Sequence, residues 1–266
     1  MLDIFNIPGQ QDNIKIFYAR GTTDWQTWQK PRNCKFIWMM CIGGGAAGQN
    51  GATVGLGGGG GGGGVVRAIF QANVLPDTLF IQPGPGGQTN LAPANRSFVS
   101  ITPSSATAMN IVCTSGATAA QPLGPGEIIA TATNMGLASL GTFIAVAGLS
   151  VNTYFTTTVI GGGGNGSSVG DPAGVGFASI NMGGIITTPL IAGGISPEGS
   201  GGADGIFSWK PFYSIGGAGG GYNSAGVGGR GGNGAYGSGG GGGGQGTVAG
   251  GTFGKGGDGL VIIATF

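Results

Sequence analysis

The chain alternates between short apolar runs and tracts of glycine. An apolar run covers residues 36–42 and ends at three glycines, 43–45. Eight consecutive glycines, 57–64, lead into a second apolar run at 65–70, and a long glycine-rich stretch leads in the same way into the run 260–266. Runs of this length that are rich in Val, Ile and Phe and bounded by glycine predict β-strands.

Further short runs continue this pattern. No window of ten or more residues combines a helical period with capping residues, so we expect almost no α-helix. Regularly spaced strands without helices predict an all-β domain, here a jelly-roll-like β-sandwich. Because 36–42 and 260–266 both adjoin glycine tracts at one end, we expect these two strands to be neighbours. The additional runs are 14–19, 75–82, 98–101, 109–114, 128–133, 143–147, 154–160, 177–181, 184–188, 206–209 and 212–215.

The glycine tracts pose a thermodynamic problem, because an ordered glycine loses more conformational freedom than any other residue. They can become ordered if they pack as left-handed helices of polyproline II type, with three residues per turn and backbone hydrogen bonds to neighbouring tracts. Glycine recurs at every third position from 228 to 246. We therefore expect polyglycine II-type helices or loops to leave the strand ends and pack against one another outside the sandwich.

The composition tests this interpretation against disorder. With 66 glycines and 13 prolines, the chain falls in the range where flexible low-complexity sequence is the usual interpretation. However, charged residues make up 7% of the chain and the net charge is +1, whereas disordered chains are usually highly charged. For a folded chain, so little charge carries a risk of precipitation as a free monomer. We therefore expect much of its surface to be covered in an assembly.

Charge and hydropathy also exclude two classes of interaction. The ten basic residues stand singly among nine acidic ones, whereas a nucleic-acid-binding protein clusters its basic residues. The uncharged stretch 128–170 is interrupted throughout by Thr, Asn, Ser and Gly, so it lacks the long apolar segment that a membrane span needs. We expect no nucleic-acid partner and no membrane-spanning segment.

The sequence offers little for catalysis. It contains no histidine, which is the commonest general base and the commonest metal ligand. The acidic residues are widely spaced, and three cysteines are too few for a disulfide framework. A Gly-x-Gly-x-x-Gly pattern at 43–48 follows a strand, but no helix follows it to bind a dinucleotide phosphate. We expect no catalytic residue, no metal and no cofactor.

A few large side chains stand alone within the glycine-rich sequence. The clearest are Tyr222, Arg230 and Tyr236. Such a side chain either anchors a tract on the sandwich or projects outward, and Tyr and Arg suit contact with a sugar or a protein surface. We therefore predict receptor binding at these three residues.

Residues 1–34 differ in composition from the glycine-rich β-sandwich domain that we expect over 35–266. The first segment holds two of the four tryptophans, Trp25 and Trp28, and also contains Arg32. Aromatic and Arg side chains are enriched in protein interfaces. One interpretation is a strand and a loop that close one end of the domain. The other is a docking arm that uses Trp25, Trp28 and Arg32.

Several motifs follow one another along the chain in a characteristic order. Trp28-x-Lys30-Pro31 precedes the strand that ends at Ile42-Gly-Gly-Gly-Ala-Ala-Gly48. The glycine run and the strand 65–70 come next, followed by Leu75-Pro-Asp-Thr-Leu79, Pro83-Gly-Pro-Gly-Gly87, 214–221, 228–232 and 256–263. Together these motifs resemble the glycine-rich domain of bacteriophage virion structural proteins.

This resemblance implies a virion component of the fibre, spike or receptor-binding type, often a homotrimer. The implied location is the virion, assembled in the host cytoplasm. The implied partners are other virion proteins, to which 1–34 would dock, and a host-cell surface receptor, either glycan or protein. We expect a non-enzymatic projection involved in host attachment. The alternative is a capsid decoration or vertex protein with a purely structural role; an ice-binding protein and an enzyme acting on host glycans are weaker alternatives.

Overall fold

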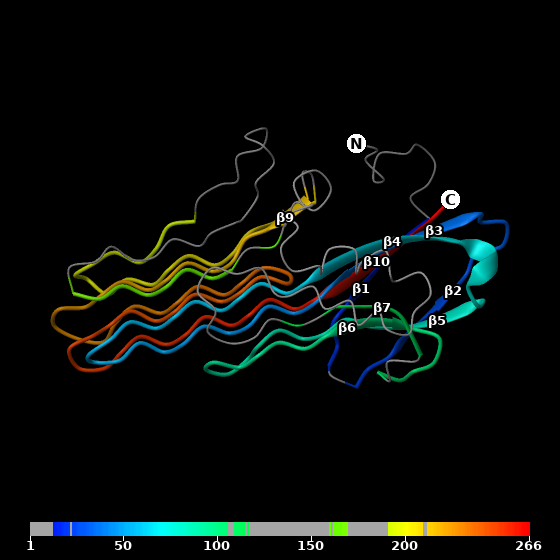
Figure 1. Ribbon diagram of the computed structural model, residues 1–266. Coiled ribbons are helices and arrows are strands. Elements are labelled where there is room, and N and C mark those ends of the chain that lie inside the picture. Colours follow the sequence, from blue (N-terminus) through cyan, green and yellow to red (C-terminus); the bar gives the residue numbers. More distant parts are fainter. Residues whose placement is uncertain are drawn as a thin grey trace, which may run out of the picture.

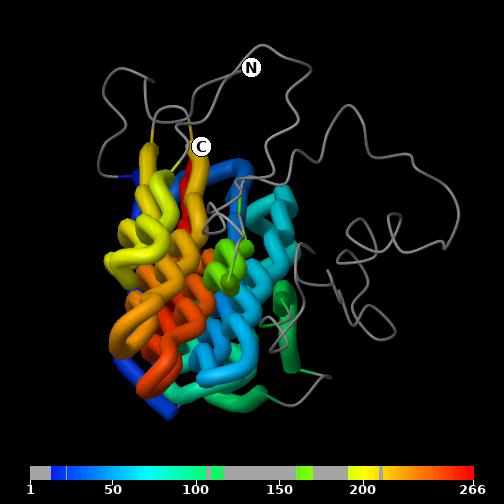
Figure 2. The backbone as a smooth tube through the Cα atoms, turned by 90° about the vertical axis from the view of Figure 1, so that its left-hand side faces the viewer, coloured from blue at the N-terminus to red at the C-terminus, as the bar shows by residue number. Residues whose placement is uncertain are grey.

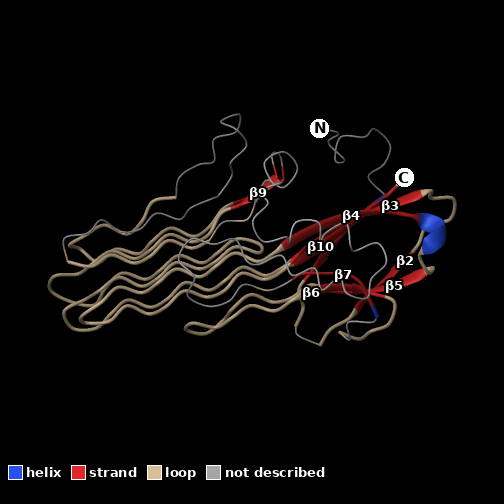
Figure 3. Ribbon diagram, viewed as in Figure 1, coloured by secondary structure: helices blue, strands red, loops and turns tan. Residues whose placement is uncertain are grey.

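Two four-stranded antiparallel sheets form a β-sandwich at one end of the molecule (Figures 1 and 3). The computed structural model describes residues 13–21, 23–105, 109–114, 116, 160, 162–169, 191–209 and 212–266. The first sheet has the order β1 (Ile14–Tyr18), β10 (Leu260–Thr265), β3 (Phe36–Ile42) and β4 (Val65–Gln71). The second has the order β2 (Gln26–Gln29), β5 (Thr78–Gln82), β6 (Ser97–Ser100) and β7 (Asn110–Thr114).

Two smaller elements complete the described part. β8 (Phe207–Trp209) and β9 (Phe212–Ser214) pair as a hairpin. A 3-10 helix, η2 (Ala72–Val74), connects β4 of the first sheet with β5 of the second.

The all-β sandwich with almost no helix that the sequence predicts is confirmed. The predicted pairing of 36–42 with 260–266 is also confirmed, because β3 and β10 are antiparallel neighbours. The predicted strands at 128–133, 143–147, 154–159, 177–181 and 184–188 lie outside the described residues.

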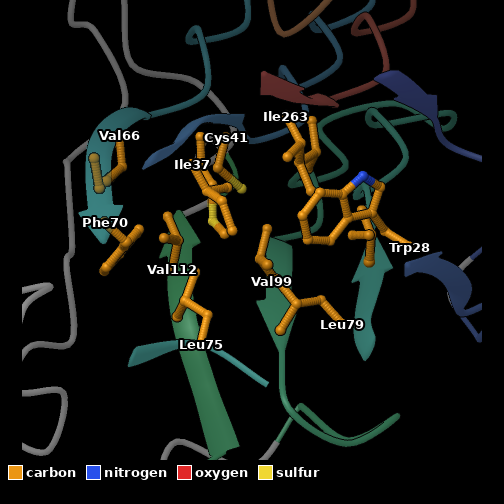
Figure 4. Close-up of a cluster of buried hydrophobic side chains, with 14 of the residues drawn as sticks. Trp28, Ile37, Cys41, Val66, Phe70, Leu75, Leu79, Val99, Val112 and Ile263 are labelled. Atoms are coloured by element: carbon orange, nitrogen blue, oxygen red, sulfur yellow. The ribbon is translucent and has the colours of Figure 1, made fainter. Parts of the chain in front are cut away.

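The core lies between the two sheets because successive side chains of a strand point to opposite faces. In β3, Ile37, Met39 and Cys41 point toward the second sheet, whereas Met40 and Ile42 belong to a separate cluster on the outer face. Figure 4 shows Ile37 and Cys41 among the side chains of the second sheet. The facing residues of that sheet include Trp28, Leu79, Ile81, Val99 and Val112.

Residues 13–34 contribute a strand to each sheet. β1 pairs with β10, and β2 pairs with β5. Trp28 in β2 is 5% exposed and lies in the main core. In the described part of the chain, this segment is therefore integrated into the sandwich.

Lys30 links the end of β2 to the connection between the sheets. Its Nζ donates hydrogen bonds to the carbonyl oxygens of Ala72 at 3.0 Å and Leu75 at 2.7 Å. It also lies 2.9 Å from Oδ1 of Asp77, whose carboxylate is mostly exposed. An exposed ion pair contributes little to stability, so the two carbonyl bonds of the part-buried ammonium group are the larger contribution.

The glycine tracts extend away from the sandwich side by side (Figures 1 and 2). We call this array the glycine lattice, and its members are the tracts 43–52, 55–64, 83–96, 162–168, 192–194, 200–205, 215–222, 226–235, 237–246 and 249–259. Backbone hydrogen bonds connect the tracts to one another, whereas the two four-stranded sheets lie at the sandwich end (Figure 3).

Hydrogen bonds from tract 43–52 repeat every three residues. Each of its three rows of N–H groups points to a different neighbouring tract, which is the pattern of a helix with three residues per turn and no internal bonds. One row runs from Gly45, Gly48 and Gly51 to the carbonyl oxygens of Gly257, Gly254 and Gly251, at 2.8, 3.0 and 2.9 Å. A second runs from Ala46 and Gln49 to Gly61 and Gly58, and a third from Gly44 and Ala47 to Asn95 and Ala92. The packed polyglycine II-type helices expected from the sequence match this bonding pattern.

Tract 237–246 occupies the centre of the lattice. Its N–H groups donate in turn to tracts 43–52, 226–235 and 162–168. Its carbonyl groups accept in turn from tracts 55–64, 215–222 and 249–259. A Cβ atom at any position from Gly239 to Gly244 would meet a backbone carbonyl oxygen of a neighbour far inside contact distance. Glycine is therefore required at six consecutive positions, because backbones surround this tract on all sides.

Glycine at the centre and glycine at the rim should respond oppositely to substitution. We expect Gly243→Ala to lower the free energy of unfolding by about 3 kcal/mol or more, because the added methyl group meets the carbonyl of Gly251. Gly58→Ala meets only the tip of the Gln49 side chain at 3.7 Å, so the lower entropy of the unfolded chain should stabilise it by about 0.5 kcal/mol. Urea denaturation measures both, and equal effects would contradict this assignment of centre and rim.

The Lys30 bonds give a second prediction. Lys30→Met retains the aliphatic stem but removes the donor from the carbonyl of Leu75, while the carbonyl of Ala72 keeps the N–H of Leu75 at 3.4 Å. The loss should cost about 1–3 kcal/mol of stability. Lys15→Met, at an exposed position of β1, is the matched control and should change stability by less than about 0.5 kcal/mol. Thermal unfolding of the two variants is the measurement; indistinguishable variants would show that the carbonyl bonds add nothing.

Candidate functional site: the distal tip

The lattice ends in five turns at the end of the molecule opposite the sandwich (Figure 1). We call this surface the distal tip and define it by residues 52–56, 167–169, 195–199, 222–227 and 246–249. Each turn joins or ends glycine tracts whose other ends lead back toward the strands. The positions of the turns therefore follow from the packing of the tracts beneath them.

Hydrogen bonds join neighbouring turns into one surface. Gln245, at the end of the central tract, donates from Nε2 to the carbonyl of Thr53 at 2.9 Å, and its Oε1 accepts from the N–H of Val169 at 3.3 Å. The N–H of Val248 donates to the carbonyl of Gly226 at 3.1 Å. Ser224 donates in the same way to Pro197 at 3.1 Å. The turns thus hold one another as well as being held by the lattice.

The side chains that project from the distal tip are mostly apolar. They come from all five turns, although the polar residues between them are numerous. Glu198 is the single charged residue within the defined tip. The exposed apolar residues are Val54 (92% exposed), Leu56 (38%), Val169 (64%), Ile195 (60%), Val227 (53%) and Val248 (70%).

Tyr222 is the one predicted receptor-binding residue that belongs to the distal tip. It is half-buried, and its N–H donates to Oγ of Ser196 in the neighbouring turn at 3.1 Å. Arg230 lies on the exposed side of the lattice, where its guanidinium is 3.1 Å from Oδ1 of Asp204. Both side chains of this ion pair are about half exposed, so the pair is worth little.

Tyr236 lies at the opposite end of its tract, roughly 28 Å from the tip at about 3.1 Å of rise per residue. Its ring packs edge-on against Phe207 at a centroid distance of 5.1 Å and tilted against Tyr18 at 5.6 Å. Partial burial, Tyr18 and Asp258 all raise the pKa of the Tyr236 hydroxyl. Tyr236 therefore anchors its tract on the outer face of the sandwich, and the structure does not bring the three predicted residues together.

The three predicted docking residues occupy different environments. Trp28 is a core residue, so its side chain offers no surface to a partner. Trp25 packs on Phe98 at a centroid distance of 6.2 Å, on the outer face of the second sheet. Arg32 is exposed and lines a shallow depression of about 420 Å³ with Lys30, Asn33 and Asp77.

Sequence reasoning missed the valines of the distal tip. Val54 and Val248 are each an isolated apolar residue after a threonine, midway between two glycine tracts. That position was the available signal, because a turn between two lattice tracts must lie at an end of the lattice. It was overlooked because lone valines in loops are common and need no explanation.

In the described ranges, no three Cys, Asp or Glu side chains lie close enough together to bind a metal ion. Nor do these ranges contain a helix with the length and hydropathy of a membrane span. Burial raises the pKa of the Cys41 thiol well above its usual range, so this cysteine is a core residue and not a nucleophile.

Comparison with known proteins identifies the family of the chain. No curated protein is significantly similar to the chain. A family model described as "Glycine-rich domain" matches residues 20–265. This match covers every described strand except β1, together with the whole glycine lattice. The chain belongs to this glycine-rich domain family.

Proposed function

We propose that the chain is a non-enzymatic structural protein of a bacteriophage virion. In this proposal it is a homotrimeric projection of the spike or fibre type that takes part in host attachment. Other virion proteins would hold its sandwich end, and the distal tip would contact the host-cell surface. The motif resemblance supports a virion component, and the distal tip supports recognition.

The exposed apolar side chains of the distal tip carry the proposal. Exposed apolar side chains that gather on one part of a surface commonly mark a binding site. Here they come from five turns at one end of the molecule, and turns carry recognition in many proteins because a rigid scaffold positions them. With one charged residue among five turns, this surface is suited to an uncharged or apolar patch on a receptor.

The lattice would also favour tight binding. Binding costs less when the contacting loops are already ordered, because fewer side chains and backbones must be immobilised. The turns of the distal tip are held by bonds such as those from Gln245 to Thr53 and from Val248 to Gly226. The contact residues of such a tip would already be ordered before the receptor binds.

The location of the protein can be tested directly. Labelled antibody against the chain, viewed by electron microscopy, should mark protruding fibres or spikes of the particle, and purified protein should bind susceptible cells. Light scattering should give the mass of a trimer. Label over the flat capsid surface, without cell binding, would favour the decoration or vertex alternative and contradict attachment.

Charges introduced at the distal tip should weaken binding. We expect the double variant Val54→Asp, Val248→Asp to bind susceptible cells roughly tenfold or more weakly, because a desolvated carboxylate must be buried at the interface. Val74→Asp places the same substitution at an exposed valine of η2, at the other end of the molecule, and should leave binding unchanged. Equal binding by the wild-type protein and both variants, with unchanged thermal stability, would exclude the distal tip as the contact surface.

A further inference from the structure

Every Asn–Gly and Asp–Gly pair of the chain lies in the glycine lattice. We call these five pairs the Asx–Gly clips. They come from five different tracts, and none of them is in a strand. The clips are Asn50–Gly51, Asn165–Gly166, Asp204–Gly205, Asn233–Gly234 and Asp258–Gly259.

The side-chain oxygen of each clip accepts a backbone N–H from another tract. At these positions the oxygen takes the place of a carbonyl group of an adjoining tract, a substitution that short Asn and Asp side chains make readily. The bonds reach Oδ1 of Asn50 from Phe253 (3.0 Å), of Asn165 from Gly59 (2.9 Å), of Asp204 from Asn233 (2.7 Å), of Asn233 from Lys255 (3.0 Å) and of Asp258 from Gly86 (2.8 Å).

The glycine of each clip is held as well. Its N–H donates to a backbone carbonyl of a neighbouring tract, so both halves of the dipeptide are engaged in the lattice. The bonds run from Gly51 to Gly251 (2.9 Å), Gly166 to Gly57 (2.9 Å), Gly205 to Asn233 (2.6 Å), Gly234 to Lys255 (2.8 Å) and Gly259 to Gly84 (2.8 Å).

These two held groups are the reacting groups of a spontaneous modification. In an Asn–Gly pair, the glycine nitrogen attacks Cγ of the asparagine, a new C–N bond closes a succinimide ring, and the side-chain nitrogen leaves as ammonia. Addition of one water then opens the ring to aspartate or isoaspartate. Glycine permits this reaction because no side chain hinders the approach or restricts the backbone. An Asp–Gly pair forms the same ring with loss of water.

The lattice opposes ring closure at both reacting atoms. Closure requires Cγ to approach the next nitrogen closely in a reactive geometry. In the clips, the side chain is instead directed to another tract, and the nitrogen must keep its proton to make its own bond. Asn50 and Asp204 are exposed to water, so it is this double engagement and not burial that separates the reacting groups.

We propose that the Asx–Gly clips are latent modification sites, which the intact lattice protects and which become reactive where the lattice opens. The inference is independent of what the distal tip binds. The two products of the reaction have different consequences for the lattice. Aspartate keeps the accepting oxygen, but isoaspartate adds a carbon atom to the backbone, which interrupts the three-residue period on which every bond along the tract depends.

The rate of deamidation tests the protection. The folded protein is incubated under mildly alkaline conditions below its unfolding temperature, and peptide mass spectrometry measures conversion at the three Asn–Gly clips. Val54→Asn supplies an internal reference, because it creates an Asn–Gly pair in the distal tip whose Gly55 N–H has no backbone hydrogen bond among the described residues. We expect the three clips to react roughly tenfold or more slowly than this reference. In urea, all four pairs should react at similar rates.

Two outcomes would overturn the proposal. Clips that react as fast as the reference in the folded protein would show no protection. A reference that reacts as slowly as the clips would show that the paired hydrogen bonds are not the cause of the slow reaction.

The different effects of aspartate and isoaspartate are tested by refolding. The Asn233→Asp variant should refold fully, whereas chains that acquired isoaspartate at position 233 in urea should be depleted from the refolded fraction. Equal recovery of both forms would contradict the effect on the tract period.

Discussion

Backbone hydrogen bonding between glycine tracts is the interaction on which the structure depends. It operates only at very short separation, and only a residue without Cβ permits that separation on all sides of Gly239 to Gly244 in the central tract. The entropy lost by each ordered glycine is opposed by bonds such as those of Gly240 to Ala46 and Gly241 to Gly232, together with the removal of the tracts from water. The sandwich fixes where the tracts begin, since β3, β4 and β10 each adjoin one.

This constraint separates two kinds of position. Positions that neighbouring backbones surround on every side, such as Gly239 to Gly244, must be glycine, whereas rim residues and turns can carry side chains without disturbing the lattice. Rim residues such as Asn233 and Asp258 complete hydrogen bonds that an absent neighbour would otherwise make. The turns of the distal tip make little contribution to the core, and their exposed valines therefore add little to stability. A low charge content is compatible with such a fold because the backbone, not side chains, supplies most of the cohesion.

The sequence predicted the parts of the fold that follow from local pattern. The glycine boundaries located β3 and β10 and their adjacency, and the three-residue recurrence of glycine indicated the lattice. The candidate site was harder, because sequence spacing does not say which end of a tract faces the sandwich. Tyr222 and Tyr236 lie on connected tracts in similar sequence surroundings, yet one is at the distal tip and the other packs on Phe207. The core position of Trp28 was hidden for a different reason, because its pairing partner Leu79 in β5 lies about fifty residues away in the sequence.

Amide hydrogen exchange tests the central claim most directly. The N–H groups of Gly240 to Gly244 in the central tract each donate to a backbone carbonyl of another tract. If these bonds maintain the fold, their exchange should be slower than in an unstructured glycine peptide by roughly a thousandfold or more, and comparable with exchange in β3 and β10. Exchange at the rate of the free peptide, with β3 and β10 still protected, would show that the tracts are flexible and would contradict the account.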